Sequence, residues 1–314
     1  MRAVVIGAGG SLEVRERADP EPGYGQILVR VRAAGINAAD LLQRLGLYPA
    51  PPGVPADIPG LEFAGEVVSC GPGADRFKPG DRVMSLAAGG AQAEMCVVHE
   101  REAMPVPSGL TWTEAGALPE AYTTAHDALI SQADLRFGER LCVHGAAGGV
   151  GTAAVQLGVA AGATVIATVR SPDKRDAVAA LGASVVDPAA TVEHGPYDVI
   201  LELVGAPNLS ANMEALANGG RLCVIGIGAG AVGEINLGLL MARRGRIHGS
   251  TLRARPLESK AHAARRVEAQ VLPLFEAGKL SVPIDSEFPL AEAEKAYDHF
   301  AAGGKFGKIV LTFD

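Results

Sequence analysis

The chain has 314 residues, a length that predicts about two domains, and 48% of them are hydrophobic, which is enough for two cores. Its formal net charge of −7 argues against a partner that is nucleic acid or an anionic membrane. The four cysteines are far apart in apolar, strand-like runs, so we expect reduced core thiols and a cytoplasmic protein.

The first 115 or so residues alternate short strand-like runs with glycine and proline turns, which is typical of a small β-barrel-like domain. The expected strands are 3–6, 26–33, 62–69, 82–86 and 94–99. A helical turn is expected between Asn37 and Gly46. A proline-rich loop follows it, and because prolines stiffen a loop, this one could form the wall of a pocket.

Residues 141–169 predict a strand, a tight turn, a helix and a second strand. The turn has the spacing Ala146-x-Gly148-x-x-Gly151, which is the dinucleotide fingerprint with alanine in the first glycine position. Glycines let the backbone approach a pyrophosphate, and the helix N-terminus supplies N–H groups to its phosphates. The expected cofactor contacts in this turn are Ala146, Gly148, Gly149, Val150 and Gly151. The same range carries no charged residue, but its glycines and its turn exclude a membrane span.

The end of the second strand indicates which dinucleotide binds. NAD sites place a carboxylate there for the ribose 2′-hydroxyl, whereas this chain has Val169 followed by Arg170, Ser171 and Lys174. Cations and a hydroxyl suit a 2′-phosphate, so we expect NADPH. The alternative is that Lys174 and its neighbour Arg175 only solvate the next helix.

From about Thr113 helices and strands alternate, which predicts a doubly wound parallel sheet. Expected helices are 172–181 and 208–216, and expected strands are 184–186, 198–203, 221–225 and 246–252. The tail predicts a long amphipathic helix over 256–278, strand-like 282–288, another helix and strand-like 307–311. This ending suggests that the chain returns to its first domain.

Over essentially its full length the chain resembles the medium-chain dehydrogenase/reductase superfamily, in its zinc-free branch of ζ-crystallin-like quinone oxidoreductases, and within it the p53-inducible subgroup. The matching segments are AAGINAADLLQRLGLY (33–48), PGLEFAGEVVSCGPG (59–73), KPGDRVM (78–84), LPEAYTTAHDAL (118–129), GAAGGVG (145–151) and FGKIVL (306–311).

The resemblance implies an α/β fold, with a GroES-like β-rich catalytic domain at 1–119 and 255–314 and a Rossmann NADPH-binding domain at 120–254. It also implies an active-site cleft between the domains and a homodimer that pairs the edge strand Arg246 to Leu252.

The resemblance further implies site residues. Asn37 and Tyr48 would donate hydrogen bonds to the substrate, although Asn37 could merely fix its turn and Tyr48 could merely pack. Asp40 is expected to brace the adjacent helix. Residues expected to contact or line the nicotinamide end are Thr124, Gly226, Ile227, Phe306 and Lys308.

The positions of the catalytic zinc ligands in alcohol dehydrogenases correspond here to Asn37 and Gly60-Leu61-Glu62, so no metal is expected. We therefore expect hydride transfer from NADPH to a quinone or an α,β-unsaturated carbonyl. Two alternatives stay open: an enoyl reductase for a CoA- or carrier-bound thioester, and a non-catalytic NADPH-binding sensor or structural protein.

Overall fold

The computed structural model describes all residues from 1 to 314, and the chain divides into two compact units. The first unit is 1–123 together with 252–314, and the second is 124–251. The division of the functional domains at residues 119 and 254 stays a prediction.

The second unit is built on a six-stranded parallel sheet in the order β10-β9-β8-β11-β12-β13. Its strands are β8 (Arg140–Val143), β9 (Thr164–Thr168), β10 (Ser184–Val186), β11 (Tyr197–Glu202), β12 (Leu216–Val224) and β13 (Arg246–Gly249). Chain order reverses between β8 and β11, which is the doubly wound Rossmann arrangement. Ligands of such sheets bind at the carboxyl ends of the strands beside this reversal.

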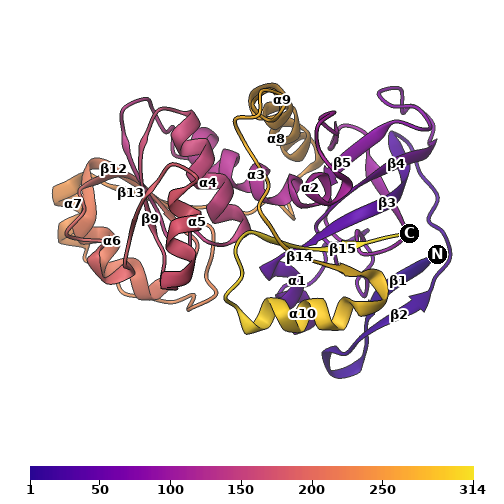
Figure 1. The fold of residues 1–314 in the computed structure, drawn as a ribbon, viewed down its shortest axis with the longest axis horizontal. Coiled ribbons are helices and arrows are strands. Elements are labelled where there is room, and N and C mark those ends of the chain that lie inside the picture. The colour runs from indigo at the N-terminus through magenta and orange to yellow at the C-terminus, as the bar shows by residue number, and fades with distance from the viewer. The chain divides into compact units, whose positions relative to one another are not determined.

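Helices cover both faces of this sheet: α4 (Gly149–Ala160) and α5 (Arg175–Ala179) lie on one side, and α6 (Leu209–Ala215) and α7 (Leu237–Arg243) on the other (Figure 1). The helix α4 packs closely because Gly158 has no side chain. A Cβ there would lie 2.6 Å from a methyl carbon of Leu141 and 2.9 Å from one of Val165. Gly162, with φ +77°, ends the helix and turns the chain into β9.

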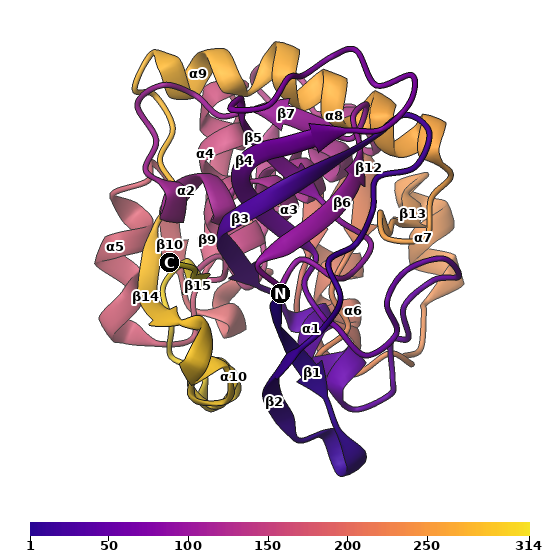
Figure 2. The same cartoon turned by 90° about the vertical axis from the view of Figure 1, so that its right-hand side faces the viewer.

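The first unit contains a seven-stranded sheet in the order β14-β15-β3-β4-β5-β7, with β6 also paired to β3, and a separate β1–β2 hairpin. In Figure 2 strands β3, β4, β5 and β7 cross side by side. The strands are β1 (Arg2–Ile6), β2 (Leu12–Glu16), β3 (Gln26–Ile36), β4 (Glu62–Cys70), β5 (Arg82–Leu86), β6 (Met95–His99), β7 (Ala103–Pro105), β14 (Ile284–Pro289) and β15 (Lys308–Thr312). Because β15 pairs antiparallel with β3, the C-terminal segment completes the sheet that the N-terminal segment begins.

The remaining helices are α1 (Ala38–Arg44), α2 (Trp112–Ala117), α3 (Pro119–His126), α8 (Leu257–Gln270), α9 (Leu272–Glu276) and α10 (Ala293–Ala302). Alternate side chains of the β3, β4 and β15 strands meet in the buried core of the first unit, with Tyr297 of α10 packed against them.

Several sequence-based expectations need correction. The edge strand predicted over 246–252 ends at Gly249, because its neighbour β12 ends at Val224 and offers no further pairing. The long helix predicted over 256–278 is two helices that meet at Val271, and Pro273 in the first turn of α9 lacks the N–H that would continue α8. The strand predicted from residue 221 begins at Leu216, and β2, β7 and α7 were not predicted.

Candidate functional site

The fingerprint turn lies between β8 and α4, at the carboxyl edge of the parallel sheet. Gly145 has φ +68°, a conformation that side chains disfavour, and Gly148 is the N-cap of α4. A Cβ at Gly151 would lie 2.4 Å from the Gly145 carbonyl oxygen, so only glycine fits there. The sequence-based frame began at Ala146 and missed Gly145, which makes the sharp bend.

The predicted contacts from Ala146 to Gly151 are contiguous in this turn and in the first turn of α4. No side chain caps the helix at Gly148, and the first N–H groups of a helix have no acceptor inside it. These N–H groups and the positive end of the helix dipole suit the pyrophosphate of a dinucleotide. The residues of this turn therefore fit a dinucleotide.

The basic residues after β9 differ in the number of hydrogen bonds and ion pairs that they make within the chain. Arg170 is exposed and has no hydrogen bond or ion pair within the chain. Lys174 contacts only its neighbour Asp173, at 3.2 Å. By contrast, Arg175 is held by Asp187 at 2.6 Å and by the Val169 carbonyl oxygen at 3.2 Å. Arg170, with Ser171 beside it, thus remains available for an anion.

A buried network that the sequence analysis missed lies beneath this edge of the sheet; we call it the His144 network. The Glu202 carboxylate at the end of β11 accepts hydrogen bonds from the backbone N–H groups of residues 204 and 205, at 2.7 and 2.9 Å. Its other oxygen accepts from the Asn212 amide at 2.7 Å. The amide oxygen of Asn212 therefore faces His144 Nε2, at 2.7 Å, while Nδ1 faces the Thr168 hydroxyl at 3.0 Å.

The His144 network joins the residue before the fingerprint glycines to the loop after β11. Because Asn212 accepts from it, His144 Nε2 carries the proton and Nδ1 accepts from Thr168. Burial lowers the pKa of His144, which favours this neutral form. Only the positions of His144 and Glu202 at strand ends could have indicated this network from the sequence.

The other predicted residues of the second unit are Thr124, Gly226 and Ile227. Thr124 is buried at the start of the unit, and Ile227 is 50% exposed. Gly226 follows β12, and a Cβ there would lie 2.2 Å from the Leu203 carbonyl oxygen. The loops after β11 and β12 can therefore lie against each other only because residue 226 is glycine.

One of the two residues expected to contact substrate, Asn37, lies in the first unit just before α1. Asn37 is the N-cap of this helix, and its backbone N–H donates to the Asp40 carboxylate at 2.8 Å. The second oxygen of Asp40 accepts from the Gly60 N–H at 3.0 Å. Asp40 therefore connects the start of α1 to the segment that leads into β4.

Four buried residues from three parts of the chain form what we call the polar cluster: Asn37 and Asp40 at the start of α1, Glu62 of β4 and Lys308 of β15. Lys308 Nζ lies 2.6 Å from the Glu62 carboxylate and donates to the Asn37 side-chain oxygen and, at 3.2 Å, to the Ile36 carbonyl. The Asn37 amide nitrogen donates to Glu62 at 3.0 Å. Glu62 also accepts from the Glu120 N–H at 2.7 Å. The polar groups of this cluster thus bind mainly to one another.

Two features of the cluster follow from its burial. A Cβ at Gly35 would lie 2.2 Å from the Glu62 carboxylate, so glycine makes room for that side chain on the sheet. Burial raises the pKa of Asp40 to about 6, although its two backbone N–H donors and nearby Lys308 oppose the shift. The pKa of Asp40 therefore lies about two units above its ordinary value of 3.8.

The side chains at the positions of zinc ligands do not fit a zinc ion. Leu61 offers no donor atom, and Glu62 is already paired with the Lys308 ammonium, which would repel a metal cation. No group of three or more His, Cys, Asp or Glu side chains is arranged to hold a metal.

Tyr48 is half-buried in the proline-rich loop after α1, and its hydroxyl makes no hydrogen bond within the chain. Burial raises the pKa of this hydroxyl. Phe306, expected near the nicotinamide, donates its backbone N–H to Asp285 at 2.9 Å just before β15. The predicted residues Asn37, Tyr48, Phe306 and Lys308 thus belong to the first unit, and the fingerprint residues to the second.

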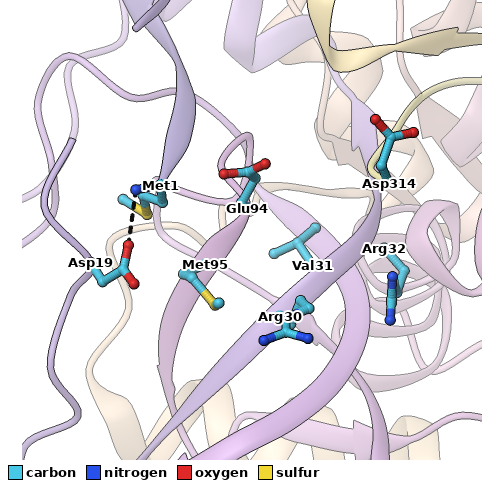
Figure 3. A pocket seen from close by; sticks show the side chains of 8 residues that line it. All are labelled: Met1, Asp19, Arg30, Val31, Arg32, Glu94, Met95 and Asp314. Carbon is cyan, nitrogen blue, oxygen red and sulfur yellow. Dashed lines mark hydrogen bonds and ion pairs between the residues drawn. The ribbon is translucent and has the colours of Figure 1, made fainter. Parts of the chain in front are cut away.

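A hollow of about 380 Å³ in the first unit is a different feature (Figure 3). Its lining is Met1, Asp19, Arg30, Val31, Arg32, Glu94, Met95 and Asp314. Most of its charges are paired, including the Met1 amino group with Asp19 at 2.9 Å and Arg32 with Glu66 at 2.8 Å. It contains no predicted site residue, and we assign it no role.

Among the helices, none combines the length and the apolar character needed to cross a membrane.

Comparison with known proteins places both units in one family. Residues 23–134 match the alcohol dehydrogenase GroES-like domain, and residues 163–311 match the zinc-binding dehydrogenase family. A quinone oxidoreductase of Pseudomonas aeruginosa is 35% identical, with 96% of this chain and 95% of that protein covered. The solved structure of mycobacterial Rv1454c complexed with NADPH covers 100% of both chains, with a TM-score of 0.89 and 27% identity.

The chain also matches part of a much longer protein. Polyketide synthase GfsB of Streptomyces halstedii is 35% identical over 92% of this chain, which spans only 5% of that synthase.

The relatives indicate oxidoreduction of a small molecule with a nicotinamide cofactor, in agreement with the fingerprint turn. The chain belongs to the medium-chain dehydrogenase/reductase superfamily, with quinone oxidoreductases among its full-length relatives.

Proposed function

We propose that this chain is an NADPH-dependent reductase that transfers a hydride to quinones or α,β-unsaturated carbonyls without zinc. The observation that carries the choice of NADPH is Arg170, an exposed guanidinium at the end of β9 with no partner in the chain. A 2′-phosphate would give it a charge-assisted partner that NADH lacks. Ser171 and Lys174 lie beside it and would complete that contact.

The fingerprint residues would bind the pyrophosphate, and Thr124, Gly226, Ile227, Phe306 and Lys308 would line the nicotinamide end. When bound, NADPH supplies the hydride. Tyr48 would donate a hydrogen bond to the acceptor oxygen on which negative charge develops, because its hydroxyl is not used elsewhere. Asn37 would be the second hydrogen-bond donor to the substrate, and Glu62 and Lys308 hold its side chain in place.

Cofactor binding tests the proposal first. Removing a charge-assisted contact costs about 1.5 to 3 kcal/mol, so Arg170→Ala should weaken NADPH binding roughly 10- to 150-fold and leave NADH almost unchanged. Fluorescence titration of the bound reduced nicotinamide measures both affinities. Arg136→Ala, which removes another exposed arginine of the same unit, is the control and should change neither. Equal losses for both cofactors from Arg170→Ala would refute the NADPH assignment.

Turnover tests the reaction. NADPH oxidation should occur with 1,4-benzoquinone, 9,10-phenanthrenequinone or simple enones. A protein that binds NADPH but reduces none of them would fit the non-catalytic alternative instead.

A second candidate is an enoyl reductase that acts on a CoA- or carrier-bound thioester. The match to polyketide synthase GfsB favours it. Comparing an enoyl-CoA, the N-acetylcysteamine thioester of the same acyl group and a free enone distinguishes the two. A thioester reductase should prefer the CoA thioester, because binding of the CoA arm adds contacts that the short thioester and the enone cannot make.

We also propose a cytoplasmic homodimer joined along β13. This strand lies at the edge of its sheet, and an unpaired edge invites pairing with a second copy. Apolar side chains in the segment that precedes β13 in the chain are exposed, Val232 at 92%, Met241 at 76% and Leu237 at 66%. Sedimentation equilibrium tests the dimer, whose expected mass is twice that of the 32.2 kDa chain.

A further inference from the structure

Arg253 carries a buried positive charge that none of the roles above uses. Its side chain is 5% exposed. The guanidinium donates to three neutral oxygens: Nε to the Ala88 carbonyl at 2.7 Å, Nη1 to the Tyr48 carbonyl at 2.9 Å and Nη2 to the Gln43 amide at 2.5 Å. No carboxylate lies within ion-pair distance of it. Burial lowers the pKa of Arg253, and the charge of Asp40 opposes that shift without a direct ion pair. A buried cation that no carboxylate contacts is costly, so a structural purpose alone explains it poorly.

The three acceptors of Arg253 surround the loop between α1 and β4. Four prolines in residues 45–58 have no N–H to donate, so this loop contains few backbone hydrogen bonds of its own. Arg253 binds its start through the Tyr48 carbonyl, and Gln43 binds its later part through the Ala56 carbonyl at 3.1 Å. The guanidinium and Gln43 therefore hold the loop at two places.

The same guanidinium also faces the aromatic ring of Tyr48. Its carbon atom lies 5.0 Å from the ring centroid, within the range of a cation–π interaction. Arg253 thus contacts Tyr48 through both the backbone and the ring face. Only the hydroxyl end of the side chain is left without a partner in the chain.

We propose that Arg253 is a positioning residue, which fixes Tyr48 and its loop and places a positive charge behind the ring, so that the hydroxyl can stabilise negative charge on the acceptor oxygen. This inference rests on the proposed reduction of a carbonyl or quinone. Arg253 itself forms no bond with the substrate, and the step assigned to Tyr48 is donation of a hydrogen bond.

The electrostatic effect on Tyr48 has a definite sign. Burial is the largest cause and raises the pKa of the Tyr48 phenol; the charge of Arg253 lowers this pKa, and the charge of Glu120 raises it. Removing the Arg253 charge should therefore raise the pKa of Tyr48 further and make it a weaker donor.

The test follows Tyr48 directly as well as the reaction. The chain has five tyrosines, so 3-fluorotyrosine incorporation should give five ¹⁹F resonances, with that of Tyr48 assigned by its loss in Tyr48→Phe. A pH titration of the labelled protein then gives the pKa of Tyr48 in the wild type, in Arg253→Gln and in Arg253→Lys. Arg253→Lys keeps the charge but loses the forked geometry, so the loop should still be held in part.

The expected result is a higher Tyr48 pKa in Arg253→Gln, a smaller change in Arg253→Lys, and a kcat lower by about 100-fold in Arg253→Gln because the donor is misplaced. The loss in kcat should disappear when Tyr48→Phe is already present. NADPH affinity should not change. Arg44→Gln is the matched control, because Arg44 also stacks on a tyrosine, Tyr297, at 6.0 Å, and should leave Tyr48 unaffected.

An unchanged Tyr48 resonance in Arg253→Gln would overturn the proposal, and so would a rate loss of the same size with and without the Tyr48 hydroxyl. If the wild type reduces no acceptor, the proposed function fails, and the ¹⁹F titration still decides whether Arg253 controls Tyr48.

Discussion

The fingerprint turn and the polar cluster are built in opposite ways. The turn is built from backbone. Gly145 bends it, and residue 151 has no space for a side chain because a Cβ there would lie 2.4 Å from the Gly145 carbonyl oxygen. The cluster uses side chains, with Lys308, Asn37 and Glu62 brought together from positions far apart in the chain. A backbone site can be found from a short contiguous motif, whereas a side-chain site exists only after folding. The two should therefore fail differently when they are mutated.

The largest effect is expected from breaking the ion pair of the polar cluster. Lys308→Met leaves the Glu62 carboxylate buried without its cation, which should lower the free energy of unfolding by about 3 to 5 kcal/mol. Urea denaturation measures it. The double variant Lys308→Met/Glu62→Leu removes both charges and should recover part of that loss. A single variant as stable as the wild type would show that the pair is not buried as described.

The pH dependence of the same cluster should be nearly as large. Asp40 has a folded-state pKa of about 6, above its ordinary value of 3.8, so the folded protein holds this proton more tightly than the unfolded chain does. Its contribution to stability is complete below pH 3.8 and is lost as pH rises through 6. The total loss is about 3 kcal/mol at most.

Unfolding measured from pH 4 to 7 in the wild type and in Asp40→Asn isolates this contribution. The variant should lack the decrease over that window that the wild type owes to Asp40. Parallel pH profiles would mean that Asp40 is ionised throughout.

Two glycines of the turn sharpen the comparison. Gly151→Ala forces a methyl group into the backbone and should cost about 1 to 3 kcal/mol of stability, together with cofactor binding. Gly148→Ala meets its nearest atom at 3.6 Å with φ −79°, so the fold should tolerate it while the methyl group obstructs the pyrophosphate. Thermal unfolding and NADPH titration separate the two effects. Equal stability losses in both variants would contradict the assignment of distinct roles.

The smallest effect is expected from the His144 network, where side chains support the backbone turn indirectly. Asn212→Leu removes the link between His144 and Glu202 and should weaken NADPH binding by about fivefold, equivalent to roughly 1 kcal/mol for a lost hydrogen bond. Asn218→Leu, at an exposed site of the same unit, is the control. Fluorescence titration of both variants would reveal whether the network supports the turn, and identical affinities would show that it does not.

The sequence predicted the alternation of strands and helices, the fingerprint and the basic strand end, because each depends on neighbouring residues. It did not predict the break at Val271 or the end of β13 at Gly249, since the first depends on one proline within an amphipathic pattern and the second on the length of the neighbouring strand. Asn37 was predicted as a substrate donor, but nothing local indicated that Lys308 and Glu62 would bind its amide. Arg253 was missed for the same reason, because its partners lie about 165 and 210 residues away in the chain.

The central claim is that hydride passes from NADPH to carbon of an electron-poor acceptor. Reduction of a simple enone with NADPH deuterated at the transferred position of C4, followed by mass spectrometry and NMR of the product, tests it directly. The account predicts one deuterium at the β-carbon of the saturated ketone, from NADPH in preference to NADH. A product without that label, or the absence of any product from a protein shown to bind NADPH, would contradict it.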